Sequence, residues 1–298
     1  MTLVDVINLF DTDDKCRELL VRLRWPNGVE CPRCKMPAVE LATAKQLFYC
    51  KGCDYQFTVT TGTVFNDSHL ALQKWFLATL LLCEAKKGMS AMQIKRTLGV
   101  SYKTAWYLCH RIRFAMTEVH KMLDGTIEVD ETYIGGKARG AGKGNYRDVK
   151  EVVIGIIQRS GDLKFIHVKE GTSKAIREVL EQHVSEDVDV IVTDESVLYP
   201  LGLPRTQVSK RKAVNHSKDE YVRYENGFMV TMNTVESAFS LFKRGIVGSW
   251  HRVSPKHLAA YLNEMTFRFN RRKSHTLFLD TLRHMVTAPV LTFERLTA

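Results

Sequence analysis

The sequence lacks any apolar run long enough to cross a lipid bilayer. A membrane-spanning helix needs roughly 20 apolar residues, and the longest apolar stretch, Trp75 to Cys83, is about half that length. The chain begins with MTLVDVINLFDTDD, which is acidic where a secretory signal peptide is basic. We therefore predict a cytoplasmic protein that does not bind membranes.

Extremes of composition are also missing. Hydrophobic residues make up 45% of the 298 residues and charged residues 26%, which is ordinary for a globular protein. These shares exclude general disorder, collagen-like repeats and a short disulfide-bonded scaffold. At roughly 150 residues per domain, the length indicates about two domains.

A nucleotide-binding P-loop is absent as well. The glycine-rich, basic segment 135–148 reads GGKARGAGKGNYRD and resembles a phosphate loop only superficially. No glycine in it is followed five places later by Gly-Lys, which the Walker A motif requires. We predict a mobile hairpin tip between two strands.

Positive charge, in contrast, is in excess, because 43 Lys and Arg against 33 Asp and Glu give a net charge of +10. Residues 31–125 hold 13 basic and 6 acidic groups (+7), and residues 205–298 hold 16 and 7 (+9). Residues 126–204 hold 10 basic and 14 acidic groups (−4). Basic blocks of this kind favour a polyanionic partner bound with release of counterions. Solvated surface charge is the plainer alternative, but an acidic middle fits a metal site that acts on a polyanion.

Four of the seven cysteines form two pairs, Cys31-Pro-Arg-Cys34 and Cys50-Lys-Gly-Cys53. Two thiolates on one tight turn reach the same ion, and four complete a tetrahedral shell, so the spacing predicts a structural zinc site. Gly52 would permit the second turn. The segments 47–49 and 55–59 flank the second pair and are predicted to be short strands. A disulfide framework is the alternative, which a cytoplasmic setting disfavours.

A helix-turn-helix is predicted after this zinc ribbon. A helical pattern covers residues 68–86, Ser90 caps a second helix that Gly99 ends, and Ser101 caps a third. In such a motif the second of the two closely joined helices enters the major groove of DNA, and an ordinary helical hairpin is the alternative. The candidate DNA contacts are Tyr102, Lys103 and Thr104 at the exposed helix start, with Arg111 and Arg113 placed to reach phosphates.

Beyond residue 125 the pattern changes to strands, and acids stand at or near the ends of two of them. Strands are predicted at 126–130, 151–158, 163–168 and 188–194, with a helix from Ser173 to about Ser185. Asp130 and Asp194 on neighbouring strands can face one another. Such close like charges need a cation between them. Their neighbours Glu131 and Glu195 would point to the other face and are predicted bystanders.

A third acid lies on a predicted helix, NTVESAFSLFKRG. Glu236, Ser240 and Lys243 fall at i, i+4 and i+7, which places them on one face. Three carboxylates that hold two Mg²⁺ or Mn²⁺ ions suit phosphodiester chemistry, because one ion activates the attacking oxygen and the other stabilises the leaving oxygen. Taken singly, each acid has a plainer alternative: Asp130 and Asp194 as surface acids at strand ends, and Glu236 as one partner of a surface pair on a helix. The apolar Val235, Phe239 and Phe242 are predicted to pack on the sheet.

These motifs, in this order, resemble the bacterial insertion-sequence transposases of the DDE class with an N-terminal zinc ribbon, the ISXO-like group. The resemblance runs from about residue 15 to residue 272 through CPRC, CKGC, TGTVF, LQKWF, SAMQIKRTLGVSYKTAWYLCHRIRFAM, VDETYIGGK, VTDES, VNHSKDEYV and NTVESAFSLFKRGIVGSWHRVSPKHLAAYLNEMTFRFNRR. It implies an α/β fold, namely an RNase H-like mixed-sheet catalytic domain preceded by the small zinc ribbon and the helix-turn-helix. The expected domains span 1–62, 63–123 and 124–298, the last with basic C-terminal helices.

The resemblance also implies roles for individual residues. Asp130, Asp194 and Glu236 would be the catalytic triad, and Lys243, with Arg244 beside it, would contact DNA. Asn233 would be an additional metal or substrate ligand, and His216 an active-site neighbour, although an ordinary surface histidine is the simpler interpretation. The chain departs from the pattern in two places, with Val230-Thr231-Met232 where a histidine is expected and Phe239 where a tryptophan is expected.

Three functions fit these residues. The first is a transposase that binds the terminal inverted repeats as a homo-oligomer on double-stranded DNA, nicks the 3′ ends and joins them to target DNA. No motif for a nucleophilic Ser, Tyr or Cys stands out, so no covalent protein–DNA intermediate is expected. The second is a catalytically silent DNA-binding regulator derived from such an enzyme. The third is an RNase H-like nuclease without strand transfer.

Overall fold

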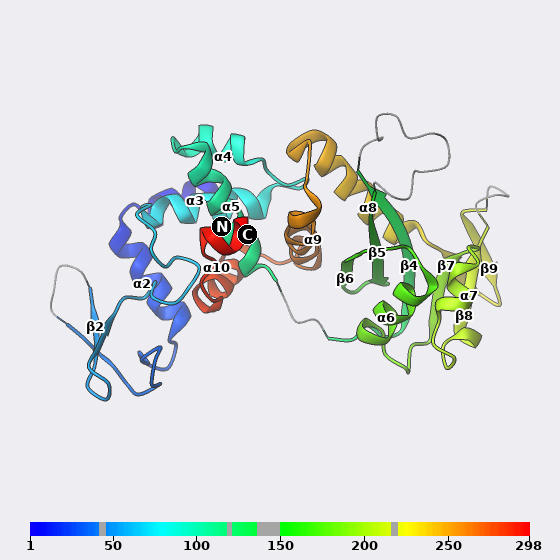
Figure 1. The fold of residues 1–298 in the computed structure, drawn as a ribbon, viewed down its shortest axis with the longest axis horizontal. Helices are drawn as coiled ribbons and strands as arrows, with labels where there is room; N and C mark the ends of the chain where they lie inside the picture. Colours follow the sequence, from blue (N-terminus) through cyan, green and yellow to red (C-terminus); the bar gives the residue numbers. More distant parts are fainter. Residues whose placement is uncertain (42–45, 118–120, 136–149, 216–219) are drawn as a thin grey trace. The chain divides into compact units, whose positions relative to one another are not determined.

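The computed structural model describes residues 1–41, 46–117, 121–135, 150–215 and 220–298. The chain divides into two compact units (Figure 1). Unit 1 comprises residues 1–117 and 271–298, and unit 2 comprises residues 118–270. The predicted hairpin tip at 135–148, apart from Gly135, and His216 lie outside the described residues.

Unit 1 is helical apart from the small three-stranded sheet of the ribbon, whose order is β1-β2-β3. The strands are β1 (Val39–Glu40), β2 (Phe48–Cys50) and β3 (Tyr55–Phe57). The helices are α1 (Leu3–Leu9), α2 (Asp13–Arg24), α3 (Leu72–Glu84), α4 (Ala91–Leu98), α5 (Tyr102–Ala115), α10 (Leu277–Thr287) and α11 (Phe293–Thr297). Trp25 at the end of α2 packs edge-on against Phe48 and Phe57 and so anchors the ribbon to that helix.

The boundaries of α4 and α5 follow from their capping residues. The Ser90 side chain accepts the Gln93 N–H at the start of α4, and the Ser101 side chain accepts the Thr104 N–H at the start of α5. Gly99 ends α4 in the left-handed conformation, with φ 62° and ψ 44°. The three caps that the sequence predicted are therefore confirmed, and only three residues separate the two helices.

The C-terminal helix α10 belongs to unit 1 and not to the unit that holds the predicted catalytic acids. Its apolar stripe is buried there, with Phe278 edge-on to Phe76 and the Thr79 hydroxyl hydrogen-bonded to the Met285 sulfur. The compact units therefore differ from the predicted boundaries, which grouped residues 271–298 with the catalytic domain. Sequence order favours the nearest domain, whereas the apolar stripe of α10 finds its partners in α2, α3 and α5.

Unit 2 is built on a five-stranded mixed sheet with strand order β6-β5-β4-β7-β8. Its strands are β4 (Thr126–Ile134), β5 (Glu151–Gln158), β6 (Leu163–Val168), β7 (Val190–Asp194) and β8 (Arg211–Val214). β5 runs antiparallel to β4 and β6, whereas β7 runs parallel to β4 and β8. The strand predictions for β4 to β7 are confirmed, with β4 extending past Asp130 to Ile134.

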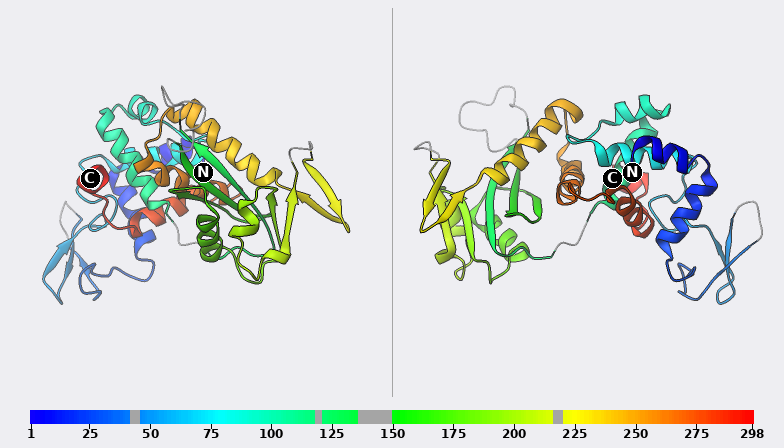
Figure 2. Two further views of the ribbon diagram at one scale, coloured as in Figure 1. Left: turned by 45° about the vertical axis from the view of Figure 1, so that its right-hand side comes forward. Right: turned by 180° about the vertical axis from the view of Figure 1, so that it is seen from behind.

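Separate hydrophobic clusters cover the two faces of this sheet. One face packs against α6 (Ser173–His183) and α7 (Leu198–Gly202), and α6 ends close to the predicted position. The other face packs against α8 (Asn233–Gly245), its π-helical continuation η4 (Ile246–Trp250) and α9 (Pro255–Asn270). Figure 2 shows α8 lying along the sheet. The prediction that Val235, Phe239 and Phe242 pack on the sheet is confirmed, since all three are buried in the α8-side cluster.

A second, two-stranded sheet lies between the main sheet and α8 in the sequence. It is the antiparallel hairpin β9 (Val222–Glu225) and β10 (Phe228–Thr231), which follows the short 3₁₀ helix η2 (Val208–Lys210) and β8. Asn226 and Gly227 form its turn with φ values of 51° and 79°, as a tight hairpin requires. Only Met232 separates the end of β10 from the first residue of α8.

No helix in the described parts of the chain combines the length and the apolar character that a membrane span requires.

Candidate functional site

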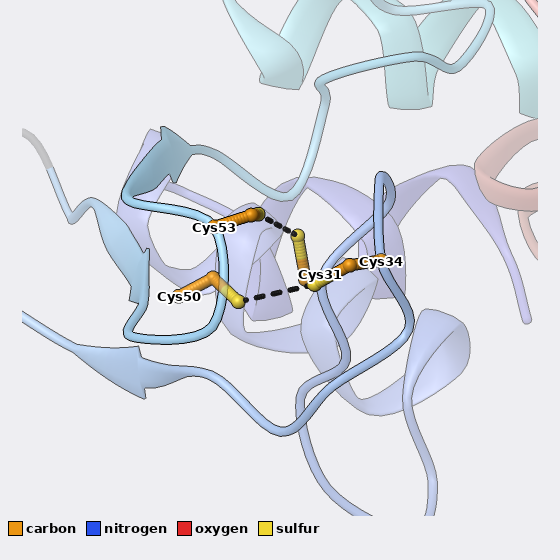
Figure 3. A group of neighbouring side chains, drawn as sticks. All are labelled: Cys31, Cys34, Cys50 and Cys53. Atoms are coloured by element: carbon orange, nitrogen blue, oxygen red, sulfur yellow. Dashed lines mark hydrogen bonds between the residues drawn. The ribbon is translucent and has the colours of Figure 1, made fainter.

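The four predicted zinc ligands converge in the ribbon of unit 1 (Figure 3). The cluster consists of Cys31, Cys34, Cys50 and Cys53, and their sulfur atoms all lie within 4.8 Å of one another. The closest contacts join Cys34 to Cys50 at 3.4 Å and Cys31 to Cys53 at 3.6 Å. Four sulfurs at this spacing fit the tetrahedral shell of a structural zinc ion, which has no open position for catalysis.

The backbone of the two cysteine turns corrects one detail. The left-handed residues are Lys35 and Asp54, each directly after a second cysteine, with φ values of 62° and 53°. Gly52, which the sequence nominated for the turn, is not left-handed, but a Cβ there would lie 3.3 Å from the Met36 side chain. Close packing therefore favours glycine at that position.

The thiols of the cluster differ in acidity. Burial alone raises the pKa of Cys31, but the N–H groups of Cys34 and Arg33 that donate to its sulfur lower this pKa to about 7. Burial and the neighbouring thiols raise the pKa of Cys53 to about 12. A zinc ion requires all four as thiolates, so its binding releases protons, among them those of Cys53 and of Cys50, whose pKa burial also raises.

The predicted catalytic aspartates lie on adjacent central strands of unit 2. β4 and β7 run parallel, and their last paired residues are Glu128 and Val192. Asp130 and Asp194 each stand two residues farther along, on the same face of the sheet, because side chains alternate along a strand. The Ser196 N–H holds one Asp194 carboxylate oxygen at 2.9 Å. The pair thus lies where the parallel strands end their pairing.

The third acid, Glu236, lies in the first turn of α8, which covers this face. A cavity of about 510 Å³ opens between β4 and α8. Its walls are formed by Asp130, Glu131, Thr132, Glu236, Phe239, Ser240, Lys243, Arg244 and Val247. The predicted one-sided array of Glu236, Ser240 and Lys243 therefore lines one cavity together with Asp130.

The carboxyl group of Asp130 is buried among other acids, and this changes its pKa. Burial, followed by the negative charges of Glu131, Asp194 and Glu236, raises the pKa of Asp130 to about 7. A proton or a cation at this position relieves the repulsion. Among the described residues, only the four cysteines bring three or more Cys, His, Asp or Glu ligand atoms within 4.8 Å of one another. The carboxylates of Asp130, Asp194 and Glu236 are therefore spaced more widely than the sulfurs.

The remaining predicted residues of this site have different settings. Lys243 and Arg244 are exposed at the cavity, whereas Asn233, the first residue of α8, is exposed but is not part of the cavity wall. Glu195 is exposed. Glu131 accepts a hydrogen bond from the buried Tyr199 hydroxyl of α7, on the opposite face, and burial raises its pKa.

Sequence reasoning missed Glu128, a fully buried carboxylate two residues before Asp130. It accepts hydrogen bonds from the Thr234 and Val235 N–H groups, both at 3.0 Å, and forms an ion pair with Arg159 at 2.9 Å. The only signal in the sequence was an acid at an inward position of an otherwise apolar strand.

The predicted DNA-contacting residues of α5 fall into two groups. Tyr102, Lys103 and Thr104 are exposed at the start of the helix, as expected. Arg111 and Arg113, however, are buried, with exposed fractions of 3% and 1%. Their guanidinium groups donate to the backbone carbonyls of Asn66 and Met89, respectively. The expectation that these two arginines reach phosphates is therefore wrong, because the helical face that carries them packs inward.

Comparison with known proteins agrees with these features. Residues 122–270 match the ISXO2-like transposase domain, and residues 11–56 match the transposase zinc-ribbon domain. The chain is 31% identical over 281 residues to a Halobacterium salinarum protein described as an uncharacterized protein in transposable element ISH50. That alignment covers 88% of this chain and 92% of the relative. The chain therefore belongs to the IS1595 family of transposases with an N-terminal zinc ribbon.

Proposed function

We propose that the protein recognises the terminal inverted repeats of its element through unit 1, and nicks the 3′ ends and transfers them to target DNA through unit 2. The observation that carries this proposal is the cavity shared by Asp130, Glu236 and Lys243, with Asp194 close enough to raise the pKa of Asp130. Acids that repel one another beside exposed cations suit a divalent metal and a phosphodiester strand.

The strand arrangement supports an RNase H-like catalytic domain. Three neighbouring strands run parallel and the strand that follows the first in sequence runs antiparallel to it, with helices on both faces. This arrangement places β4 and β7, the first and fourth strands in sequence order, side by side near the centre of the sheet. Their acids, Asp130 and Asp194, then meet the helix that follows the sheet, which carries Glu236.

Recognition of DNA is assigned to α4 and α5, as a helix-turn-helix. The three-residue connection, the left-handed Gly99 and the exposed Tyr102, Lys103 and Thr104 support this assignment. Because two ends must be brought together for transposition, we expect more than one copy of the chain on the DNA.

In the proposed mechanism, Asp130, Asp194 and Glu236 would hold Mg²⁺ or Mn²⁺, with Asn233 as an additional ligand. Bound there, the ions would supply activation of the attacking oxygen and stabilisation of the leaving oxygen. Lys243 and Arg244 position the phosphodiester backbone along α8. The attacking group is first water and then the freed 3′ hydroxyl, so no side chain is bonded to the DNA.

A nicking and joining assay tests the proposal, using DNA that carries the inverted repeats flanking the reading frame. We expect the unaltered protein to cleave and join strands only with Mg²⁺ or Mn²⁺. Asp194→Asn should abolish both reactions while end binding persists, and the matched neighbour Glu195→Gln should leave them unchanged.

The other outcomes separate the remaining functions. End binding without any metal-dependent nicking would assign the chain as a catalytically silent regulator. Nicking without joined products would make it a nuclease. Full strand transfer by Asp130→Asn would remove the carboxylates from the mechanism.

A further inference from the structure

The buried carboxylate of Glu128 has an unusual set of partners. Its side chain has an exposed fraction of 0%, and a charged residue is almost never fully buried unless it is paired. One oxygen accepts the Thr234 hydroxyl at 3.0 Å and the Arg159 Nε at 2.9 Å. The other accepts two backbone N–H groups, of Thr234 and Val235. The carboxylate therefore joins β4 to the start of α8.

The start of α8 receives little capping from nearby side chains: the Thr231 hydroxyl accepts the Asn233 N–H at 3.3 Å. The residue at the capping position is Met232, which makes no side-chain hydrogen bond to the first turn. The first N–H groups of a helix lack partners within the helix and carry partial positive charge. Glu128 satisfies the next two, of Thr234 and Val235, from a different element, so it caps α8 where Met232 cannot.

Arg159 extends this link to the hairpin. Its guanidinium donates to the carbonyls of Met229 at 2.6 Å and Thr231 at 2.8 Å, both on β10. It also lies over the Phe228 ring, 5.3 Å from the centroid. Because Thr231 stands two residues before α8, Arg159 fixes the direction from which the chain enters the helix.

These contacts tie together the two elements that carry catalytic acids. On β4, Asp130 stands two residues after Glu128 and on the same face; on α8, Glu236 stands two residues after Thr234. We propose that Glu128 and Arg159 are positioning residues that set the height and rotation of α8, and thereby place Glu236 against Asp130 for metal binding. The inference rests on the metal-binding triad of the proposed function.

Stability alone is a weak explanation for this arrangement. Taking an ion pair out of water is costly, and well-packed apolar residues of similar volume often stabilise a fold equally well. An apolar contact, however, permits a helix to slide or rotate. A carboxylate that accepts two directed N–H bonds fixes both movements, which is what a metal site assembled from two elements needs.

The test measures Mn²⁺ binding by the full-length protein. Residues that orient metal ligands typically change metal affinity by roughly 10- to 100-fold when they are altered. We expect Glu128→Gln to weaken Mn²⁺ binding about tenfold, because its amide nitrogen would oppose N–H donors. The matched control is Glu264→Gln, which alters the buried carboxylate of an ion pair with Arg268 inside the single helix α9. This control should bind Mn²⁺ as the unaltered protein does.

Hydrogen exchange of the metal-free protein provides the second readout. We expect amides in the first turn of α8 to exchange faster in Glu128→Gln, with α9 unchanged, and the reverse in Glu264→Gln. If Glu128→Gln fails to fold, Thr234→Val replaces it, because it removes one donor to Glu128 and keeps both backbone N–H groups. We then expect a smaller loss of Mn²⁺ affinity in the same direction.

The two readouts separate this inference from the proposed function. If the unaltered protein binds no Mn²⁺ through Asp130, the metal site of the proposed function fails, and exchange at α8 still decides whether Glu128 holds the helix. Unchanged exchange at α8 in the folded variant, or unchanged Mn²⁺ affinity in a protein that binds Mn²⁺ through Asp130, would overturn the inference.

Discussion

At the level of single residues, Asp130 combines burial with three neighbouring acids, and its raised pKa of about 7 has a consequence for metal binding. Below pH 7 its proton competes with the cation, so Mn²⁺ affinity should fall about tenfold for each pH unit. Above pH 7 the affinity should level off. Titrations of the full chain between about pH 5.5 and 8.5 measure this profile.

The sign of the accompanying stability change is opposite to that of most carboxylates. A raised pKa favours the protonated folded state, so this contribution to metal-free stability is present below pH 3.8 and is lost as the pH rises through about 7. Asp130→Asn cannot ionise and should remove this dependence. A pH-independent Mn²⁺ affinity in the unaltered protein would contradict the assignment of Asp130 as a ligand.

Single residues also show where sequence reasoning stopped. The cysteine spacing located the zinc cluster, because ligands on tight turns are close in both sequence and space. Arg111 and Glu128 could not be assigned in this way. Arg111 is basic on a helix with two apolar sides, and only tertiary packing shows that it faces inward over the Trp75 ring. Glu128 has partners more than 100 residues away, on α8.

At the level of elements, α8 approaches the sheet so closely that position 155 of β5 has room only for glycine. A Cβ on Gly155 would lie 2.6 Å from Cζ of Phe239 and 3.1 Å from Cε1 of Phe165. Gly155→Ala should therefore lower the free energy of unfolding by about 1–3 kcal/mol through overpacking. Urea unfolding followed by circular dichroism measures the difference.

Gly248→Ala is the matched control, since nothing lies within 4 Å of a Cβ at that position. It should leave the free energy of unfolding nearly unchanged. Combining Gly155→Ala with Phe239→Leu should recover part of the loss. Equal effects of the two glycine substitutions would mean that α8 shifts freely over the sheet.

The ribbon is an element whose fold depends on its ion. Its strands are two or three residues long and bury few side chains, so we expect Cys50→Ser to abolish zinc binding and unfold the ribbon. Metal content by mass spectrometry measures the zinc. Cys83→Ser alters a cysteine that contacts Thr281 outside the cluster and should retain the ion. Retention of zinc by Cys50→Ser would contradict four-sulfur coordination.

Elements differ in how far their sequence defines them. The helices α4 and α5 carry their own caps, and β5 is a dense β-branched run interrupted only by Gly155, so local pattern predicted them. The strands β8, β9 and β10 have four residues each and mixed polarity, and they exist through pairing with β7 or with each other. Local pattern does not contain that information, which explains why the hairpin before α8 was not predicted.

At the level of the whole molecule, the assignment of residues 271–298 to unit 1 leads to a deletion experiment. Removing this segment uncovers the apolar surface of α3 that α10 buries. We expect faster hydrogen exchange in α3 and α5 and weaker binding to end DNA, while β4 and β5 remain protected. If the deletion instead speeds hydrogen exchange in the sheet of unit 2, residues 271–298 belong with the catalytic domain.

Both ends of the chain belong to unit 1, as the N and C marks in Figure 1 indicate, so the backbone passes between the units twice. After a single proteolytic cut in one connection, unit 2 would remain covalently attached only to the segment of unit 1 on the uncut side, either residues 1–117 or residues 271–298. A tag fused at either terminus would therefore be attached to unit 1, which we assign to DNA recognition. It would not be attached directly to unit 2, which bears the acids.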